Sequence, residues 1–311
     1  MSSTGYRTIS VVTVSRNAAA TIADCLASVR GQSTEAEHVV VDGGSSDGTL
    51  ALVARLGSAT TAVLSGRDEG IYDAMNKGMT RCRGEIVGTL NADDFYAHDR
   101  VLERVARVFD DGNVDACYGD LLYVGQRLRA GGDGGSGGDT ARGVAAAFEG
   151  SSLYASEASG ETARVFSLPG ETIVRRWSAG SFGPRAFHWG WMPPHPTFFV
   201  RRRVYEELGG YRLDMGTAAD YELMLRFLVR HGIRAAYLPE VLVKMRCGGA
   251  SNRSLGSRLR ANRMDRRAWA VNGLTPLPWT PWLKPLRKLG QWVRRPAPPG
   301  EKTIRAKGPV P

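Results

Sequence analysis

Two hydrophobic periods alternate along the first 125 residues of the chain. Short β-branched runs predict strands at 9–15, 38–42, 62–65, 85–90 and 116–124, of which the first, second and fourth are expected to be buried. Between them, apolar residues recur at helical spacing over 22–29, 50–56, 71–82 and 101–109. Asn17 and Asp47 are expected to cap the first two of these helices. Strands that alternate with helices in this way predict βαβ units, in a mostly parallel α/β sheet with helices on both faces.

The handedness of such units predicts where a ligand site should lie. Crossovers between parallel strands are almost always right-handed, so the loops that follow the strands meet along one edge of the sheet. Ligands bind at that edge in open α/β sheets. We therefore expect the functional residues of this chain to follow its strands directly.

The alternation stops after residue 125. The stretch 131–160 contains GGDGGSGGD, which is too rich in glycine to bury an apolar face and predicts a surface insertion. A mobile lid over a site is the alternative. Regular patterning resumes near Thr172, with a strand expected over 196–200 and helices over 204–208 and 218–229.

The composition argues against several classes of protein. A length of 311 residues indicates one large domain or two small ones, and 42% hydrophobic with 23% charged residues exclude a largely disordered chain. No apolar run reaches the ~20 residues of a membrane-spanning helix, and the short run at 9–14 does not make a secretory signal. The four cysteines form no CxxC pair, which favours a reducing, cytoplasmic setting over a disulfide framework or a zinc ribbon.

The net charge of +10 is concentrated at one end of the chain. From Lys244 onward there are 16 lysines and arginines against two acidic residues, a balance of +14, whereas the first 243 residues carry −4. The tryptophans interleaved with this basic stretch are Trp269, Trp279, Trp282 and Trp292. Such a segment suits an anionic membrane surface. The alternative is a helical flap that packs its tryptophans on the body of the protein.

The strongest local signal is Asn91-Ala92-Asp93-Asp94, directly after the strand predicted at 85–90. Two adjacent carboxylates repel each other and lose hydration at the end of a buried strand. A divalent cation would compensate them, and Mg²⁺ is typically held by one or two carboxylates together with substrate phosphates. We therefore predict that Asp93 and Asp94 bind Mg²⁺ or Mn²⁺. The alternative is an Asx turn in which Asp94 caps the next helix.

Two further polar segments lie where a ligand could be bound. The segment 42–49, DGGSSDGT, places Asp42 directly after a strand, where its carboxylate could bind a ribose or a base. A tight turn followed by a helix cap is the alternative explanation. The segment 67–78 can put Asp73, Asn76 and Lys77 on one helix face, and the alternative there is a solvated face.

An acidic residue also opens the helix predicted at 218–229. Asp220 would stay ionised at the N-terminus of this helix, because the helix dipole favours negative charge there. A carboxylate of this kind can accept a proton from a hydroxyl group as that group attacks. The alternative is a helix cap. His195 lies upstream, in the sequence MPPHP.

Several common chemistries find no support in the sequence. There is no GxxxxGK[ST] loop and no GxGxxG fingerprint, which argues against a P-loop and a dinucleotide cofactor. None of the five histidines lies in HExxH or a comparable spacing, which argues against a zinc site. The absence of GxSxG and CxxC leaves hydrolase and oxidoreductase functions unsupported.

Taken in order, seven segments resemble the family 2 inverting glycosyltransferases with the GT-A fold, and more narrowly the WcaA-like branch that builds bacterial surface polysaccharides. The segments are ISVVTVSRN, HVVVDGGSSDGT, GRDEGIYDAMNKG, GEIVGTLNADD, CYGDLLYV, GWMPPHPTFFVRR and AADYELMLR. The resemblance covers residues 8–125 and 172–246. It implies a GT-A catalytic domain over 1–250, made of a nucleotide-sugar-binding half (1–125), the Gly-rich insertion (126–171) and an acceptor half (172–250). A basic tail (251–311) follows.

The resemblance also implies roles for individual residues. The nucleotide-sugar donor would be bound by Thr13, Ser15, Asn17, Asp42, Asp68, Asn76, Lys77 and Asp93. Asp93 and Asp94 match the element that holds a metal on the diphosphate, although its usual first acid is Asn91 here. Many relatives have a second acid after Asp42, where this chain has Gly43. Asp220 lies at the place of the catalytic base, and the candidates on the acceptor side are His195, Asp73 and Tyr72.

The implied reaction is a single displacement with inversion at the sugar carbon. A divalent cation, Mg²⁺ or Mn²⁺, would neutralise the charge that develops on the leaving nucleoside diphosphate, and Asp220 would take the proton of the acceptor hydroxyl. A lipid-linked glycan is the expected acceptor, and the tail would then hold the enzyme on the inner face of the cytoplasmic membrane. Two alternatives are a nucleic-acid-binding protein that uses the tail and a nucleotidyltransferase on a similar sheet, for which the usual triphosphate loop is missing.

Overall fold

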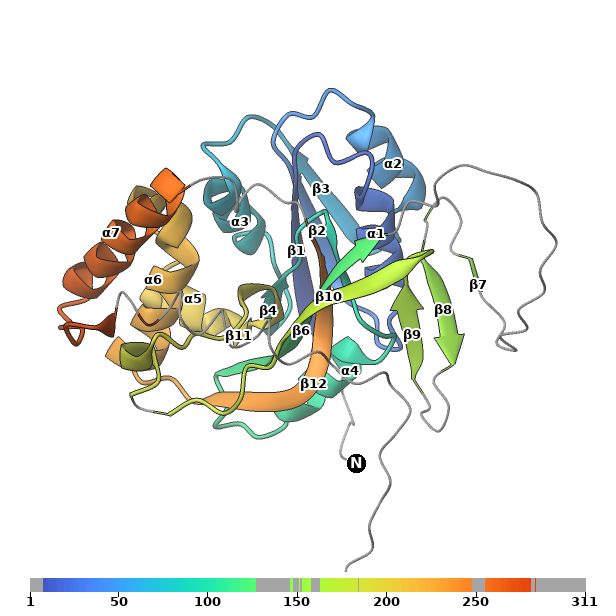
Figure 1. Ribbon diagram of the computed structural model, residues 1–311. Coiled ribbons are helices and arrows are strands. Elements are labelled where there is room, and N and C mark those ends of the chain that lie inside the picture. The colour runs from blue at the N-terminus through green and yellow to red at the C-terminus, as the bar shows by residue number, and fades with distance from the viewer. Residues whose placement is uncertain are drawn as a thin grey trace, which may run out of the picture.

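Figure 1 shows the computed structural model of the chain, which describes residues 8–126, 146–147, 151, 153–157, 163–183, 185–247, 255–280 and 283. Among these residues a nine-stranded sheet forms the centre. Its strands run in the order β3 (Thr61–Ser65), β2 (Glu37–Asp42), β1 (Ile9–Ser15), β4 (Ile86–Thr89), β11 (Phe199–Arg201), β6 (Ala116–Gln126), β12 (Ala235–Arg246) and β5 (Asp94–Tyr96), and β10 (Glu171–Trp177) also pairs with β6. The first four strands are parallel, whereas β11 and β5 run antiparallel to their neighbours. The predicted α/β class is confirmed.

Helices cover both faces of this sheet. One face carries α1 (Ile22–Arg30), α2 (Thr49–Leu56) and α4 (Val101–Val108), and the other carries α3 (Ile71–Met79), α5 (Arg202–Leu208) and α6 (Ala219–Leu225). Successive residues of β1 point to opposite faces: Val11 packs with α1 and α4, while Val12 and Val14 pack with α3 and α6. A strand covered on both sides needs apolar residues on both sides, which explains the continuous hydrophobic run in its sequence.

In the first half of the chain the structure contains the predicted strands and helices, but one helix does not begin where the sequence predicted. β1 begins and ends as predicted, and Asp47 Oδ1 accepts a hydrogen bond from the backbone N–H of Thr49 at 3.1 Å, at the start of α2. The prediction that Asn17 caps α1 is wrong, because that helix begins at Ile22. Asn17 instead adopts a left-handed backbone conformation, with φ of 51°, and its side chain binds the loop after β2.

The second half is less regular than its sequence pattern predicts. β7 (Ala146–Ala147), β8 (Tyr154–Glu157) and β9 (Arg164–Ser167) form a separate three-stranded sheet. The rest of the segment predicted as a surface insertion or lid lies outside the described residues. The strand expected at 196–200 starts as a 3₁₀ turn, η2 (His195–Thr197), and the helix expected at 218–229 divides into α6 and a π-helical turn, η4 (Arg226–Arg230).

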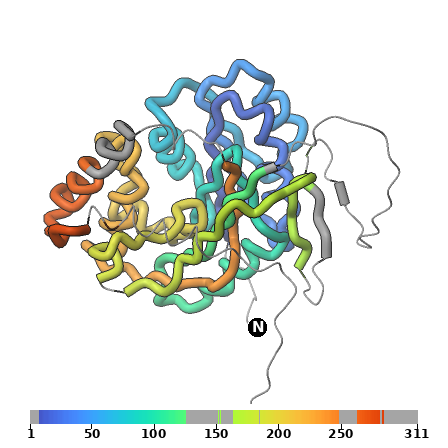
Figure 2. Tube along the Cα trace, viewed as in Figure 1, coloured from blue at the N-terminus to red at the C-terminus, as the bar shows by residue number. Residues whose placement is uncertain are grey.

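The first part of the basic tail packs on the body of the protein. α7 (Leu255–Val271) lies beside α6, on its outer side (Figure 2). Trp269 is 2% exposed and belongs to the core that also contains α3 and α6, whereas Trp279 is 46% exposed. Trp282 and Trp292 lie outside the described residues. None of the helices in the described ranges combines the length and the apolar character needed to cross a membrane.

Candidate functional site

Three parallel strands bring polar residues together at one edge of the sheet. Ser15, Asp42 and Ser65 end β1, β2 and β3 in register. Asp42 is fully buried, and its carboxylate accepts four hydrogen bonds within 3.2 Å, from the hydroxyls of Ser15 and Ser45 and from the backbone N–H groups of Gly44 and Ser45. The Asp42 side chain therefore shapes the turn after β2, which leaves it little capacity to bind a ligand directly.

The loop after β1 is fastened to the loop after β2. Asn17 Oδ1 accepts a hydrogen bond from the backbone N–H of Ser46 at 2.9 Å, and the backbone N–H of Asn17 donates to Ser45 Oγ at 2.8 Å. The backbone N–H of Ala18 donates to Thr49 Oγ1, also at 2.8 Å. Asn17 is exposed at the rim of this edge, so its role in binding the donor stays a prediction.

Thr13 does not lie in a position to bind a donor. It is fully buried within β1, where its hydroxyl lies 2.9 Å from His38 Nε2 and 3.5 Å from Cys25 Sγ. Burial lowers the pKa of His38 to about 4, so the imidazole is neutral and forms this hydrogen bond without a charge. The contact predicted for Thr13 is corrected to a core role, because its polar atom is already satisfied inside the sheet.

The segment after β3 carries Asp68 on a loop held by α3. Asp73 pairs with Lys77 at 2.7 Å and accepts a hydrogen bond from the backbone N–H of Glu69 at 3.0 Å. Lys77 Nζ donates to the backbone carbonyl of Arg67 at 3.1 Å. The hydrogen bond to Asp73 raises the pKa of Lys77, which therefore stays charged at neutral pH. Asp73 and Lys77 thus hold the backbone of residues 67–70, which carries the half-buried Asp68 and the exposed Glu69.

Asn76, which was expected to bind the donor, links two halves of the fold instead. Its Nδ2 donates to the backbone carbonyl of Tyr211 at 2.9 Å, and its Oδ1 accepts from the backbone N–H of the same residue at 2.8 Å. Both ends of the amide are therefore used. Asn76 fixes the position of Tyr211, which lies 135 residues further along the chain.

The turn between β4 and β5 contains the predicted metal residues. Asp94 is fully buried and its Oδ2 accepts a hydrogen bond from Asn91 Nδ2 at 3.1 Å, whereas Asp93 is half-buried. Within the described ranges, Asp94 Oδ1 and Asn91 Oδ1 are buried with no hydrogen-bond partner. Burial and then the charge of Asp93 raise the pKa of Asp94 well above its usual value. Arg246 lies beside this turn: its charge opposes the rise in the pKa of Asp94, and its guanidinium donates to the backbone carbonyl of Asp93 at 3.0 Å. The turn therefore combines side-chain oxygens that have no hydrogen-bond partner with one neighbouring positive charge.

Oxygen atoms of this kind fit a hard divalent cation. The described part of the chain contains no group of three or more histidine, cysteine, aspartate or glutamate side chains that could enclose a metal. A cation at this turn would therefore take further ligands from water or from substrate phosphates, as Mg²⁺ commonly does. Asp93 offers the accessible carboxylate for such binding.

Asp220 lies in a cluster of aromatic side chains at the start of α6. Burial and then the charge of the nearby Asp220 raise the pKa of Tyr72, on α3, well above its usual value. The rings of Tyr72 and Tyr211 are 5.2 Å apart, and the Tyr211 hydroxyl lies 2.6 Å from His195 Nε2. Burial lowers the pKa of His195, and the charge of Asp220 opposes that shift. The structure thus groups Asp220 with Tyr72 and His195.

Tyr211 also connects this cluster to the turn that carries Asp93. Thr89, the last residue of β4, acts on the pKa of Tyr211 and so lies near its side chain, and Asn91 follows two residues later. The aromatic cluster therefore lies at the same edge of the sheet as the predicted metal residues. Tyr211 was missed by the sequence interpretation, because its partners all come from distant segments.

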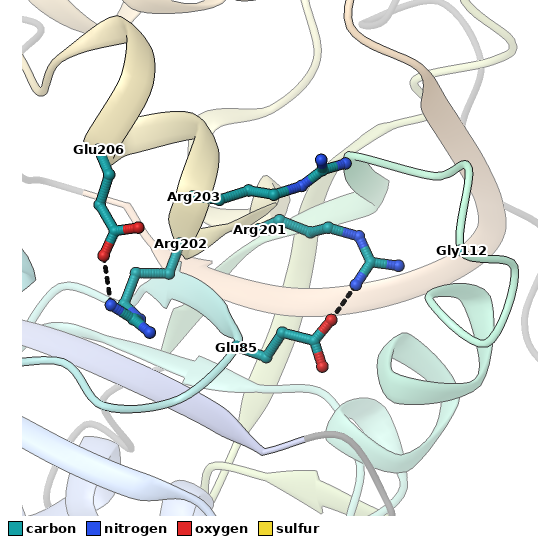
Figure 3. Close-up of a pocket in the computed structure, with 6 residues that line it drawn as sticks. All are labelled: Glu85, Gly112, Arg201, Arg202, Arg203 and Glu206. Carbon is teal, nitrogen blue, oxygen red and sulfur yellow. Dashed lines mark hydrogen bonds and ion pairs between the residues drawn. The ribbon is translucent and has the colours of Figure 1, made fainter.

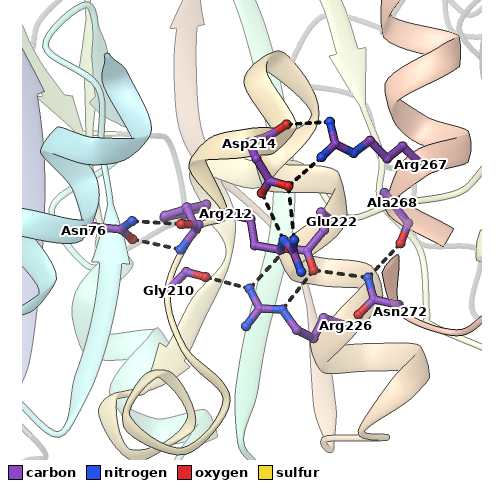
Figure 4. A network of polar contacts seen from close by, with 10 residues as sticks. Asn76, Gly210, Arg212, Asp214, Glu222, Arg226, Arg267, Ala268 and Asn272 are labelled. Carbon is purple, nitrogen blue, oxygen red and sulfur yellow. Dashed lines mark hydrogen bonds and ion pairs between the residues drawn. The ribbon is translucent and has the colours of Figure 1, made fainter. Parts of the chain in front are cut away.

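A polar network supports the loop that carries Tyr211 (Figure 4). Arg226 pairs with the buried Glu222 at 3.0 Å and donates to the backbone carbonyl of Gly210 at 2.6 Å. Asn272, which follows α7, donates to Glu222 Oε1 at 3.1 Å. Two residues of opposite charge four positions apart on a helix could have been recognised in the sequence, but their contacts with the loop and with Asn272 could not.

The same network reaches α7 through a surface acid. Asp214 pairs with Arg212 at 3.1 Å and with Arg267 of α7 at 2.8 Å. The loop between α5 and α6 is therefore tied to α7 from one side and to Glu222 and Arg226 from the other. These pairs fasten the segment that leads into α6, on which Asp220 lies.

A cavity of about 310 Å³ lies at the opposite edge of the sheet, beside the start of β4 (Figure 3). It is lined by Glu85, Gly112, Arg201, Arg202, Arg203 and Glu206. The three arginines are paired with acids, as Arg201–Glu85, Arg202–Glu206 and Arg203–Asp115. Arg201 is also buried and donates to backbone carbonyls, so this cluster has a structural role.

Comparison with known proteins identifies the family of this chain. Residues 10–134 match the model of the family "Glycosyl transferase family 2". An uncharacterized glycosyltransferase of Mycobacterium tuberculosis is 30% identical over 229 residues, which cover 72% of this chain and 70% of that protein. A PGL/p-HBAD biosynthesis glycosyltransferase of the same species is 34% identical over 129 residues, which cover 40% of this chain and half of that relative.

Two solved structures share the fold. TarS 1–349 of S. aureus in complex with UDP-GlcNAc superposes with a TM-score of 0.57 at 16% identity, covering 85% of this chain and 66% of that one. Mannosyltransferase PcManGT from Pyrobaculum calidifontis, in complex with GDP-Man and Mn²⁺, superposes with a TM-score of 0.53 at 18% identity, covering 90% of this chain and 69% of that one. The chain belongs to glycosyltransferase family 2 and is a nucleotide-sugar-dependent glycosyltransferase with a GT-A-like fold.

Proposed function

We propose that this enzyme transfers a sugar from a nucleoside diphosphate sugar to a hydroxyl group with inversion, in one displacement that uses Asp220 as the base. The observation that carries the proposal is the contact of Tyr72 and His195 with Tyr211, beside which the charge of Asp220 acts on all three side chains. A carboxylate in this position can accept the proton of an attacking hydroxyl.

The neighbours of Asp220 fit this role. Tyr72 lies near the carboxylate, and its raised pKa keeps its hydroxyl protonated as a hydrogen-bond donor. His195 is neutral because burial lowers its pKa, so it adds no positive charge that would weaken the base. Asp73 holds the loop after β3, which is a supporting role on the donor side rather than a contact with the acceptor.

The metal site proposed here consists of Asp93, with the oxygens of Asp94 and Asn91 beside it. A divalent cation bound there would neutralise the charge on the leaving diphosphate. The Mn²⁺ in the PcManGT complex supports this proposal. Asp93→Asn should weaken binding of a nucleoside diphosphate in the presence of Mn²⁺ and leave the weaker metal-free binding unchanged. Equal loss with and without Mn²⁺ would show that Asp93 does not act through a metal.

A donor screen tests the reaction itself. Purified enzyme is incubated with Mn²⁺ or Mg²⁺ and a panel of nucleotide sugars, and release of nucleoside diphosphate is measured. We expect one donor to be hydrolysed above all others, even without an acceptor. Asp220→Asn should abolish transfer while its affinity for that donor survives, and Glu207→Gln, on the exposed side of α5, is the matched control. Equal loss of donor affinity in Asp220→Asn would exclude it as the base.

We further propose that the acceptor is a lipid-linked glycan, as in the WcaA-like branch, and that the C-terminal region contacts an anionic membrane. An exposed pair of tryptophans supports this proposal: Trp189 and Trp279 are 6.3 Å apart, and the neighbouring Arg185 is exposed as well. Tryptophan at a membrane interface, together with basic residues, favours binding to anionic lipids.

Vesicle flotation tests this surface. The tested chain should lack only residues 284–311, because removal from 255 onward would take away the buried Trp269. We expect the shortened chain, or Trp279→Ser, to lose binding to anionic vesicles, with zwitterionic vesicles as the control. If the shortened chain loses affinity for oligonucleotides to the same extent as for anionic vesicles, the removed residues attract anions in general and not a membrane in particular.

A further inference from the structure

The peptide group that joins Asp93 to Asp94 is held at both of its ends. Its N–H, which belongs to Asp94, donates to the backbone carbonyl of Asn91 at 3.0 Å and closes the turn. Its carbonyl, which belongs to Asp93, accepts a hydrogen bond from Arg246 Nη1, also at 3.0 Å. The orientation of this peptide decides how the two acidic side chains lie relative to each other. Arg246 therefore bears on the geometry of both acids.

Arg246 is itself fixed by several contacts. It is the last residue of β12, whose register places Met245 opposite Asp94. Its Nη2 forms an ion pair with Asp24 of α1, which is 3% exposed. Its guanidinium also lies over the buried ring of Phe95, 5.4 Å from the ring centroid. Arginine can bridge an acid and a carbonyl in this way because its planar guanidinium presents several N–H donors in fixed directions.

The buried acid that pairs with Arg246 is held by a third segment. Asp24 Oδ1 accepts a hydrogen bond from Ser151 Oγ at 2.7 Å. A buried carboxylate is stable when it has both a charged partner and a further hydrogen bond, and Asp24 has both. Because Asp24 balances the charge of Arg246, the pair holds the turn and still leaves Asp93 and Asp94 with negative charge for a cation.

We infer that Arg246 is a positioning residue of the metal site, which fixes the peptide between Asp93 and Asp94 in the orientation that binds a divalent cation, with Asp24 as its counter-ion. The inference rests on the proposed function, which places a cation at this turn. Arg246 acts through its hydrogen bond to the Asp93 carbonyl, whereas its positive charge alone would repel a cation. The two effects have opposite signs, so an experiment can separate them.

Mn²⁺ binding by variants of this ion pair gives the test. Each protein is titrated with Mn²⁺ in the presence of GDP or UDP, and free Mn²⁺ is measured by its electron paramagnetic resonance signal. Arg246→Met removes both the hydrogen-bond donor and the charge. Arg246→Met combined with Asp24→Asn removes one positive and one negative charge, so the net charge stays the same. Arg176→Met is the matched control, since Arg176 pairs with the buried Asp120 at 2.8 Å elsewhere in the sheet.

We expect both Arg246→Met proteins to bind Mn²⁺ roughly 10-fold more weakly, as for the loss of one charge-assisted hydrogen bond. Arg176→Met should bind Mn²⁺ as the unmodified chain does. Tighter Mn²⁺ binding by Arg246→Met would show that Arg246 acts through its charge, and would overturn the inference. Unchanged Mn²⁺ affinity with a lower melting temperature would also overturn it, because Arg246 would then support only the fold.

A lysine variant keeps the test decisive if Arg246→Met does not fold. Arg246→Lys retains the charge and can still pair with Asp24, but its ammonium lacks the planar fork of the guanidinium. It should therefore recover the melting temperature of the unmodified chain more fully than the Mn²⁺ affinity. Full recovery of Mn²⁺ affinity by lysine would contradict the bridging role.

Failure of this inference can be distinguished from failure of the proposed function. If the unmodified chain binds no Mn²⁺ with either nucleotide, or if Asp93→Asn binds Mn²⁺ as tightly as the unmodified chain, the proposed metal site fails and this inference fails with it. If Asp93→Asn weakens Mn²⁺ binding while the Arg246 variants do not, only the role of Arg246 fails.

Discussion

The indole Nε1 of Trp269 donates a hydrogen bond to the hydroxyl of Tyr221 at 2.9 Å, and Tyr221 is the residue directly after Asp220. Both side chains are buried in the core cluster that includes α3 and α6. α7 therefore holds the helix of the proposed base from its outer side, as the sheet does from within (Figure 1).

Substitution of Trp269 should destabilise the protein. Trp269→Ala empties a large core site and should cost about 3–5 kcal/mol of unfolding free energy. Trp269→Phe keeps an aromatic ring but loses the hydrogen bond to the Tyr221 hydroxyl, at a cost of about 1 kcal/mol. Urea unfolding measures both. Trp279→Ala, at an exposed site, is the control and should change stability by less than about 0.5 kcal/mol. An equal effect at the two sites would contradict the packing of α7.

Two arginine–glutamate pairs with the same helical spacing should differ in their contribution to stability. Glu222 and Arg226 are largely buried, so Glu222→Gln leaves a buried charge unpaired and should cost about 3–5 kcal/mol. Glu206 and Arg202 are exposed, so Glu206→Gln should cost no more than about 0.5 kcal/mol. Thermal unfolding of the two variants compares them directly. Similar losses would show that Glu222 does not support the loop before α6.

The link between Asn76 and Tyr211 should matter for turnover. Asn76→Ala removes two hydrogen bonds to the Tyr211 backbone, so we expect lower kcat and a loss of about 1–3 kcal/mol in stability. Asn76→Asp keeps the acceptor but turns a carboxylate oxygen toward the Tyr211 carbonyl, and should behave no better. Kd for the nucleotide should stay close to that of the unmodified enzyme. A large rise in Kd with unchanged kcat would instead make Asn76 a donor-binding residue.

Acid should destabilise the protein through His38. The pKa of His38 is lowered to about 4 by burial, from an ordinary value of 6.5, so the unfolded chain binds the proton more readily. The contribution of neutral His38 to the free energy of unfolding is therefore complete above pH 6.5. As the pH falls toward 4, up to about 3 kcal/mol of this contribution is lost. His38→Gln should lose less over the same range. Unfolding free energies of the two proteins at pH 7 and pH 4.5 test this, and parallel losses would refute it.

Local patterns in the sequence predict the fold and part of the site. The strand runs, the position of Asp93 and Asp94 after β4, and the position of Asp220 at the start of α6 all depend on residues close together in the chain. Each of these features follows from spacing and burial within a few residues. That is why the α/β class and the edge of the sheet could be predicted.

Contacts between distant segments could not be predicted in the same way. Thr13 was expected at the donor site because it lies in the first strand, but the register that places it diagonally opposite His38 is not visible in the sequence. Asn76 shares a helix face with Asp73 as predicted, yet its partner lies 135 residues away. A polar side chain that bonds to a residue far away in the sequence looks, in the sequence alone, like a side chain that binds a ligand.

The packing of α7 also limits where homologous chains can end. The outer side of α6 is apolar and needs a cover, which this chain supplies from a segment whose sequence looks like a basic appendage. A homologue that ends soon after β12 must shield that surface by another route, such as a second subunit or more polar residues on the helix itself. The C-terminal boundary of the catalytic unit is therefore defined by the burial of a tryptophan and not by the onset of positive charge.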